Sequence, residues 1–201
     1  MKNIVIDNFL PYPNVVRSWA LSQRFYNCED YSFIIGHDTS WPGTRTQHVM
    51  DLDSDYANVT LGQFSQLLGR HFSEGSMSIK SYFQSCLKDD GDSWVHQDND
   101  VDIAAVLYLT PNAPISSGTS TYRCKNIEKW SRLNIDDMKK INSQEKVELY
   151  ENLFERVDYF GNVFNRIIIY PGTTFHKSNE YFGNSKENGR LTQVFFAKFE
   201  K

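Results

Sequence analysis

Hydrophobic and polar positions alternate in short segments, most of them in the second half of the chain. Segments 76–83 and 190–199 alternate with a period of two, and residues 118–124 are rich in β-branched and aromatic side chains. Segments 102–109 (DIAAVLYL) and 163–170 (VFNRIIIY) are almost continuously apolar. These patterns predict five strands, and the stretch NIVIDNFL near the beginning adds an opening strand.

Three segments show the three- and four-residue spacing of amphipathic helices. The first begins at Asn14, the second spans Tyr56 to Phe72, and the third lies between the predicted strands, from about Ile135 to Phe154. We therefore expect an α+β fold in a single domain, 1–201. Residues 1–75 are mainly helical support, and 76–201 are a β core with a helical insertion at about 125–160.

The composition is that of a globular protein, with 14 Phe, 11 Tyr and 23% charged residues. The net charge of -4 comes without long runs of one sign, which argues against a general nucleic-acid or membrane-surface binder. Cys28, Cys86 and Cys124 are widely spaced, as expected for unpaired thiols in a reducing compartment. No apolar span of ~20 residues occurs, so we expect a cytoplasmic protein.

Candidate chemistry begins at SWVHQDNDVD, residues 93–102. Positions i and i+2 of an extended chain point to one side, so His96 and Asp98 can converge on a divalent transition metal. A surface turn with two polar residues is the alternative. His176 follows the Pro171–Gly172 turn and is either a further ligand or a satisfied core histidine.

A basic residue opens the final predicted strand. Arg190 and Thr192 share one face of it, while Leu191 and Phe195 point to the other. An inward arginine suits a carboxylate because its planar fork pairs with two oxygens. The partner is either a ligand or a structural Asp or Glu.

The order of these motifs resembles the iron(II)- and 2-oxoglutarate-dependent dioxygenases, especially their prolyl 4-hydroxylase-like branch. The order is HQD, a strand ending YLT, then SSGT, a strand with a Pro-Gly turn, then His and Arg, over residues of about 78 to 199. The resemblance implies a double-stranded β-helix, or jelly roll, as the core fold.

By that resemblance His96, Asp98 and His176 are the iron ligands, and Arg190 grips the C5 carboxylate of the cosubstrate 2-oxoglutarate. Thr192 assists the arginine, and the Tyr108 phenol binds the same carboxylate. The implied reaction uses O2, with ascorbate as an additional reductant. It hydroxylates a C–H bond of a peptidyl or small-molecule substrate and releases succinate and CO2.

Several features leave the substrate class open. The gap from His176 to Arg190 and the insertion are long for this branch, and Tyr82 is a loose match to a cosubstrate-contacting tyrosine. Within the loop HDTSWPGTRTQH, His37, Trp41, Arg45 and His48 are either substrate contacts or ordinary loop packing.

Two rival functions remain, a non-enzymic metal-binding jelly-roll domain and a cosubstrate-free metalloenzyme of the cupin type. Cupins usually carry His-x-His with a nearby glutamate, which the sequence lacks. The oligomeric state stays open.

Overall fold

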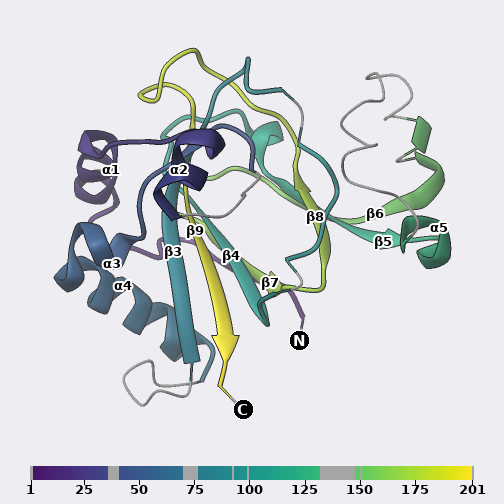
Figure 1. Cartoon of the computed structure of the whole chain (residues 1–201), viewed down its shortest axis with the longest axis horizontal. Helices are drawn as coiled ribbons and strands as arrows, with labels where there is room; N and C mark the ends of the chain where they lie inside the picture. Colours follow the sequence, from purple (N-terminus) through teal and green to yellow (C-terminus); the bar gives the residue numbers. More distant parts are fainter. Residues whose placement is uncertain are drawn as a thin grey trace.

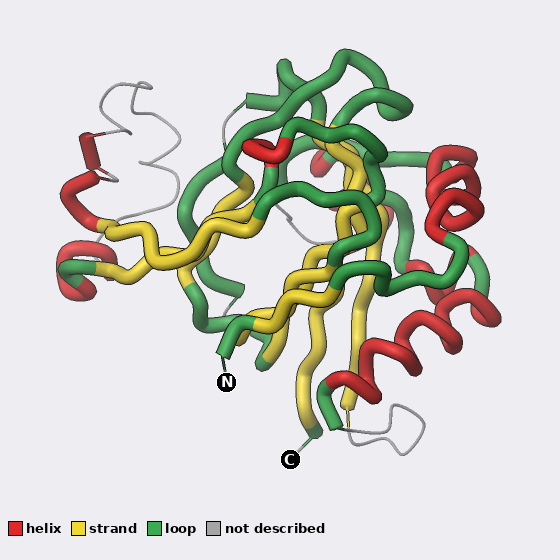
Figure 2. The backbone as a smooth tube through the Cα atoms, turned by 180° about the vertical axis from the view of Figure 1, so that it is seen from behind, coloured by secondary structure: helices red, strands yellow, loops and turns green. Residues whose placement is uncertain are grey.

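The described part of the chain forms two antiparallel sheets with helices packed beside the larger one (Figures 1 and 2). The computed structural model describes residues 2–35, 41–69, 77–91, 93–98, 100–131, 148–149 and 151–200. The larger sheet has the order β1-β7-β4-β9-β3-β2, and the smaller has the order β6-β5-β8.

The strands of the larger sheet are β1 (Ile4–Ile6), β2 (Thr44–Arg45), β3 (Met77–Cys86), β4 (Ile103–Tyr108), β7 (Ile167–Pro171) and β9 (Arg190–Phe199). Those of the smaller sheet are β5 (Thr119–Cys124), β6 (Phe154–Phe160) and β8 (Phe175–Ser178). The described helices are α1 (Pro13–Ser22), α2 (Cys28–Ile35), α3 (Val49–Leu52), α4 (Ser54–Leu67), α5 (Ile127–Ser131) and the 3-10 turn η2 (Ile115–Ser117).

Helices α1 and α4 cover one face of the larger sheet. Pro13 stands in the first turn of α1, where its missing N–H costs nothing. The Asp53 carboxylate caps α4 by accepting hydrogen bonds from its first backbone N–H groups. The Phe64 ring of α4 stacks on Phe195 of β9 with centroids 5.0 Å apart, so the helix is fixed by its apolar face.

Strand β9 has a different environment on each face. Leu191, Phe195 and Ala197 belong to the core against the helices, because successive side chains of a strand alternate. Arg190, Val194 and Phe196 face the other way, toward a cavity between the two sheets. The predicted partition of this strand is confirmed, and it places a charged side chain opposite the main core.

The fold is an antiparallel, sheet-rich α+β fold, as the sequence pattern predicts. The strands expected at 76–83, 102–109, 118–124 and 190–199 appear with nearly these bounds, and the fifth is shorter, β7. The three cysteines, all described, form no disulfide.

The end of the predicted insertion is a strand. The sequence predicts a helical segment from about Ile135 to Phe154 within an insertion at about 125–160, and Phe154–Phe160 of this insertion is strand β6, paired with β5. Pairing satisfies its backbone, and its Phe, Val and Tyr side chains suit a pleated strand. Together with α5 it projects from the rest of the molecule (Figure 1). Helix α2 was not anticipated, and most of the stretch 135–154 lies outside the described residues.

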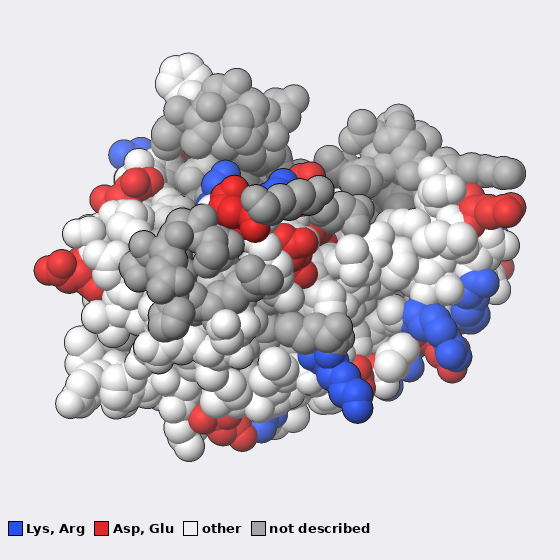
Figure 3. All heavy atoms as spheres, turned by 90° about the horizontal axis from the view of Figure 1, so that it is seen from below, with Lys and Arg blue, Asp and Glu red and all other residues white. Residues whose placement is uncertain are grey.

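Helices long and apolar enough to span a membrane do not occur in the described part of the chain. On the face shown in Figure 3, acidic and basic side chains of the described residues form small groups separated by uncharged surface.

Candidate metal centre

The backbone brings His96, Asp98 and His176 together. His96 and His176 pair as an isolated antiparallel bridge, with N···O distances of 3.0 and 2.9 Å in the two directions. Two residues on, the Asp98 N–H donates to the Gly172 carbonyl at 2.8 Å. The segment before β4 therefore runs alongside β8, and the two sequence motifs meet.

A close backbone approach makes this arrangement depend on Gly172. A Cβ atom at this position would lie 2.2 Å from the Val101 oxygen and 2.7 Å from the Asp98 oxygen. Both are far inside van der Waals contact, so only glycine fits without a shift. The Pro171–Gly172 turn thus lets the Asp98 segment pack against the end of β7.

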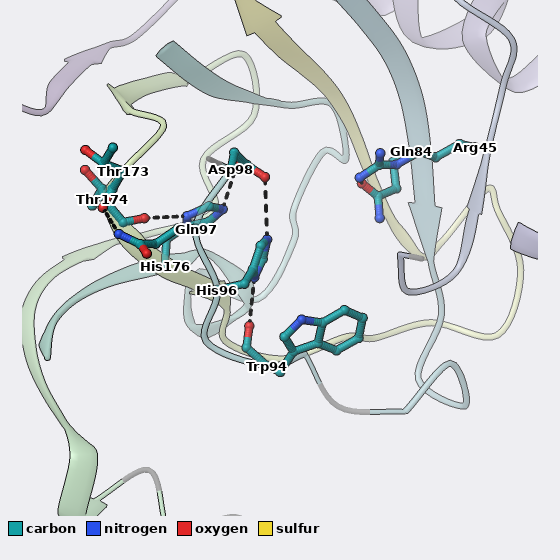
Figure 4. Close-up of polar contacts among 9 residues, drawn as sticks. All are labelled: Arg45, Gln84, Trp94, His96, Gln97, Asp98, Thr173, Thr174 and His176. Atoms are coloured by element: carbon teal, nitrogen blue, oxygen red, sulfur yellow. Dashed lines mark hydrogen bonds and ion pairs between the residues drawn. The ribbon is translucent and has the colours of Figure 1, made fainter. Parts of the chain in front are cut away.

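The three side chains converge on one point (Figure 4). His96 Nε2 lies 3.9 Å from Asp98 Oδ1, and His176 Nε2 lies 3.5 Å from Asp98 Oδ2. One ligand atom from each residue lies within 4.8 Å of the other two. Two imidazoles and one carboxylate on one side of a metal leave further coordination positions open, as in non-haem iron(II) oxygenases.

Backbone carbonyls fix the tautomers of both histidines. His96 Nδ1 lies 3.0 Å from the Trp94 oxygen, and His176 Nδ1 lies 2.9 Å from the Thr174 oxygen. A carbonyl only accepts, so Nδ1 carries the proton and the Nε2 lone pair of each ring is left for a metal. Orientation of this kind is typical of metal-binding histidines.

Burial shifts the pKa values of His176 and Asp98, and these shifts favour the uncharged form of each side chain. Burial lowers the pKa of His176 to about 3, aided by repulsion from His96 and opposed by the Thr174 carbonyl. Burial also raises the pKa of Asp98, against the attraction of His96 and Arg45. A neutral His176 is competent as a ligand, and a divalent cation supplies a positive charge next to the half-buried Asp98 carboxylate. The donor set therefore fits iron(II).

A cavity of about 300 Å³ opens beside the triad, between the two sheets. Its apolar wall comes from β4 and β9, and includes Ala104, Val106, Val194 and Phe196. The smaller sheet contributes Thr119, His176 and Ser178. Arg190 also lines this cavity, so the predicted metal ligands and the predicted carboxylate clamp share one cavity.

Arg190 is 3% exposed and has an unused donor. Its Nε donates to the Ser117 oxygen at 3.0 Å, while its buried Nη2 has no hydrogen-bond partner. Among the described residues no carboxylate pairs with it. The described part of the chain therefore contains no structural ion pair of Arg190. A buried guanidinium without a negatively charged partner is costly, and a bound anion would lower that cost.

The other two predicted cosubstrate contacts are fully buried near Arg190. The Tyr108 ring centroid lies 5.5 Å from the Arg190 guanidinium carbon, and its hydroxyl donates to Thr119 Oγ1 at 2.8 Å. Thr192 pairs with Tyr108 across β4 and β9, and its Oγ1 lies 3.5 Å from the Gln84 oxygen. Both predicted residues are thus beside the arginine, with their hydroxyls already engaged.

The loop of open role divides into two kinds of residue. Trp41 and Arg45 line the cavity. The sequence alone allows either substrate contact or loop packing for these two residues. His48 is structural, because its Nδ1 accepts from the Met50 N–H at the start of α3. Tyr82 packs against the rings of His48 and Phe196, and His37 lies outside the described residues.

Gln84 is a cavity residue that sequence reasoning missed. Gln84 lies on β3, where the alternation of polar and apolar residues distinguishes the two faces of the strand. The alternation does not show which of the polar residues lines the cavity. The Gln84 amide contacts Arg45.

Comparison with known proteins gives a family and a fold. The model of a family of unknown function, DUF6445, matches residues 2–197. No curated protein matches the sequence.

Solved structures match over almost the whole chain. A prolyl-4-hydroxylase from Pseudomonas putida is 13% identical with a TM-score of 0.54, covering 99% of this chain and 93% of its own. HygX from Streptomyces hygroscopicus, solved with nickel, 2-oxoglutarate and hygromycin B bound, is 12% identical with a TM-score of 0.62, covering 98% and 82%.

An oxidoreductase of the 2OG-Fe(II) oxygenase family from Burkholderia pseudomallei is 10% identical, with a TM-score of 0.60 and coverage of 98% and 84%. At such identities the likeness concerns the fold alone. The chain belongs to the DUF6445 family, and its fold is similar to that of the 2-oxoglutarate- and iron(II)-dependent oxygenases.

Proposed function

We propose that this protein is an iron(II)- and 2-oxoglutarate-dependent dioxygenase that hydroxylates a C–H bond of an organic or peptidyl substrate. The observation that carries the proposal is the joint presence, in one cavity, of the His96–Asp98–His176 group and a buried Arg190 with an unpaired Nη2. A structural metal site has no need of the arginine, and an isolated arginine has no need of the three ligands.

The residues would hold the metal through His96 Nε2, His176 Nε2 and an Asp98 carboxylate oxygen. The Trp94 and Thr174 carbonyls keep the Nδ1 protons in place, so each ring presents its lone pair without a prior proton loss. When bound, iron(II) with O2 and 2-oxoglutarate supplies the oxidation of R–H to R–OH, with succinate and CO2 as the other products.

Arg190 would bind the C5 carboxylate of 2-oxoglutarate through Nη2, while its Nε stays bonded to Ser117. The pair is charge-assisted and lies in a water-poor environment, since Arg190 is 3% exposed. Tyr108 and Thr192 would hold the arginine in place from β4 and β9. The apolar wall formed by Ala104, Val106, Val194 and Phe196 would exclude water from the reacting bond.

We extend the proposal to the finer fold and branch. The two antiparallel sheets facing each other across the cavity are consistent with a double-stranded β-helix in one domain. The likeness to the Pseudomonas putida prolyl-4-hydroxylase and the motif order support a prolyl 4-hydroxylase-like branch. This domain would comprise 1–201.

The decisive experiment measures succinate formed from 2-oxoglutarate by the purified protein with iron(II), O2 and ascorbate. We expect slow formation without any primary substrate, and loss of both metal binding and succinate in Asp98→Ala. Anaerobic addition of 2-oxoglutarate to the iron(II) protein should give a visible charge-transfer band that Asp98→Ala lacks.

The rival functions give different results. A non-enzymic metal domain would bind a metal yet neither bind nor consume 2-oxoglutarate. A cosubstrate-free metalloenzyme would keep its metal and show no 2-oxoglutarate-dependent band. Full succinate formation by Asp98→Ala would refute the metal assignment.

A further inference from the structure

A second arginine is held in the wall of the same cavity. Arg45 of β2 donates from Nη2 to Gln84 Oε1 at 3.0 Å, and Gln84 Nε2 in turn donates to the Pro42 oxygen at 2.8 Å. The guanidinium carbon lies 4.7 Å from the Trp41 ring centroid and 5.6 Å from that of Phe196. Two aromatic rings and one amide thus keep this cation in a fixed position.

No described group pairs directly with that charge, and Asp98 attracts it only from a distance. Arg45 Nε is buried and has no hydrogen-bond partner, and the same is true of the neighbouring Trp41 Nε1. Within the described part of the chain no carboxylate forms an ion pair with Arg45. Buried N–H donors without acceptors are costly, and the cost at Arg45 falls once an anion binds there.

The charges around the cavity show which molecule is missing. Of the described residues that line it, the charged ones are Arg45, Asp98 and Arg190. In the proposed enzyme, a divalent iron and Arg190 balance Asp98 and the dianion of 2-oxoglutarate. Arg45 is then the surplus cation, which leaves one negative charge for the primary substrate to bring.

We propose that Arg45 binds a carboxylate of the primary substrate, and that Trp41 and Phe196 contact an apolar or aromatic group next to it. This inference rests on the proposed function. In Figure 4 Arg45 and Gln84 lie together, apart from the triad. A substrate anchored there by its carboxylate can extend its reacting carbon toward His96 and Asp98. The substrates are thus carboxylic acids, and Arg45 determines specificity.

The single surplus charge favours a carboxylate over a phosphoryl group, which carries about −1.5 to −2 at neutral pH. The cavity volume of about 300 Å³ has to accommodate 2-oxoglutarate as well as part of the substrate. Ligand pockets usually start at about that size, so only the reacting end of the substrate enters. A carboxylate can pair with the guanidinium fork through both of its oxygens.

The test compares acids with their own amides. The probes are phenylacetate, benzoate, N-acetylphenylalanine and N-acetylleucine, each beside its primary amide, with affinities measured by calorimetry. The wild type, Arg45→Gln and Arg190→Gln are each measured with manganese(II) and 2-oxoglutarate, and again without both. Arg45→Met is a second variant in case Arg45→Gln does not fold, because it fills similar space without the charge.

We expect the wild type to bind at least one acid about tenfold tighter than its amide, the size of one hydrogen bond to a charge. Arg45→Gln and Arg45→Met should bind acid and amide alike and keep the wild-type affinity for 2-oxoglutarate. Arg190→Gln should show the opposite pattern, weak 2-oxoglutarate binding with the acid preference retained.

Three results would overturn the inference: no acid preferred by the wild type, a preference that survives in both Arg45 variants, or 2-oxoglutarate binding that depends on Arg45. The last result means that Arg45 is the cosubstrate clamp, and it leaves the dioxygenase proposal standing. Failure of the wild type to bind manganese(II) and 2-oxoglutarate refutes the proposed function instead. The series without both ligands then still shows whether Arg45 selects acids.

Discussion

Replacement of Gly172 by alanine tests how the turn after β7 fixes the proposed metal ligand Asp98. The new Cβ would lie 2.2 Å from the Val101 oxygen, about 1.2 Å inside the 3.4 Å at which ordinary contact begins. The backbone has to open to accept it. Two hydrogen bonds resist that opening, from the Asp98 N–H to the Gly172 oxygen at 2.8 Å and from the Gly172 N–H to the Asp102 oxygen at 2.9 Å.

The cost should appear in both stability and metal affinity. Overpacking of this kind typically lowers the free energy of unfolding by about 1–3 kcal/mol. Displacement of a ligand by a change in its supporting contacts typically weakens metal binding about 10–100-fold. We expect Gly172→Ala to show both effects, measured by urea denaturation of the metal-free protein and by anaerobic iron(II) titration.

Gly62→Ala is the matched control. Gly62 lies in α4, and a Cβ there meets nothing within 4 Å. Alanine in a helix is favoured over glycine by about 0.5–1 kcal/mol, so this variant should be slightly more stable with unchanged iron affinity. If Gly172→Ala matched the wild type in both measurements, the close approach would have no role in placing Asp98.

Three further predictions concern the same cavity. Arg190→Gln should weaken 2-oxoglutarate binding by about 2–5 kcal/mol, at least tens-fold, and leave iron binding unchanged. Arg190→Lys should recover only part of the lost 2-oxoglutarate affinity, because lysine lacks the planar fork. Tyr108→Phe should lower the free energy of unfolding by about 1 kcal/mol through the lost hydrogen bond to Thr119, and weaken 2-oxoglutarate binding less than Arg190→Gln does. The pKa of His176 is lowered from 6.5 to about 3, so the unfolded chain binds the extra proton. The free energy of unfolding of the metal-free protein should therefore fall as the pH falls from 6.5 toward 3. His176 contributes at most about 1.4 kcal/mol per pH unit to this decrease, and His176→Gln should make the dependence of stability on pH less steep.

Each of these has an outcome that contradicts it. Equal 2-oxoglutarate affinities in the wild type and both Arg190 variants would make Arg190 a purely structural residue. Arg123→Gln is its control, because Arg123 is exposed and pairs with Glu155 on the surface. A Tyr108→Phe loss as large as that of Arg190→Gln would assign the phenol a direct contact. An unchanged pH slope in His176→Gln would mean that other groups set it.

Local periodicity was enough to predict the strand faces that carry the site. In β9 the alternation separates Arg190 and Thr192 from Leu191 and Phe195, because a strand has a fixed period and one of its faces is the core. The same rule placed His96 and Asp98 on one side. Their meeting with His176 is a long-range backbone bridge, and only the order of motifs in a known family indicated it.

Other features left no pattern in the sequence. Strand β2 has two residues, Thr44 and Arg45, too few for any period, so the position of Arg45 beside Gln84 follows only from pairing with β3. Strand β6 is mostly exposed along Phe154–Phe160, so it lacks an apolar face to mark it. Both segments are placed by partners distant in sequence, and local propensity has little weight there.

The position of β9 between β3 and β4 has a consequence for the making of the protein. On the ribosome, β3 and β4 emerge long before β9, and their edges facing the later strand stay unpaired until residues 190–199 have been synthesised. Exposed strand edges are templates for association with other chains, and pairings this distant in sequence form slowly. Nascent chains of this protein therefore carry two unpaired strand edges while the residues between β4 and β9 are synthesised. Its yield in cells should depend on chaperones that shield them.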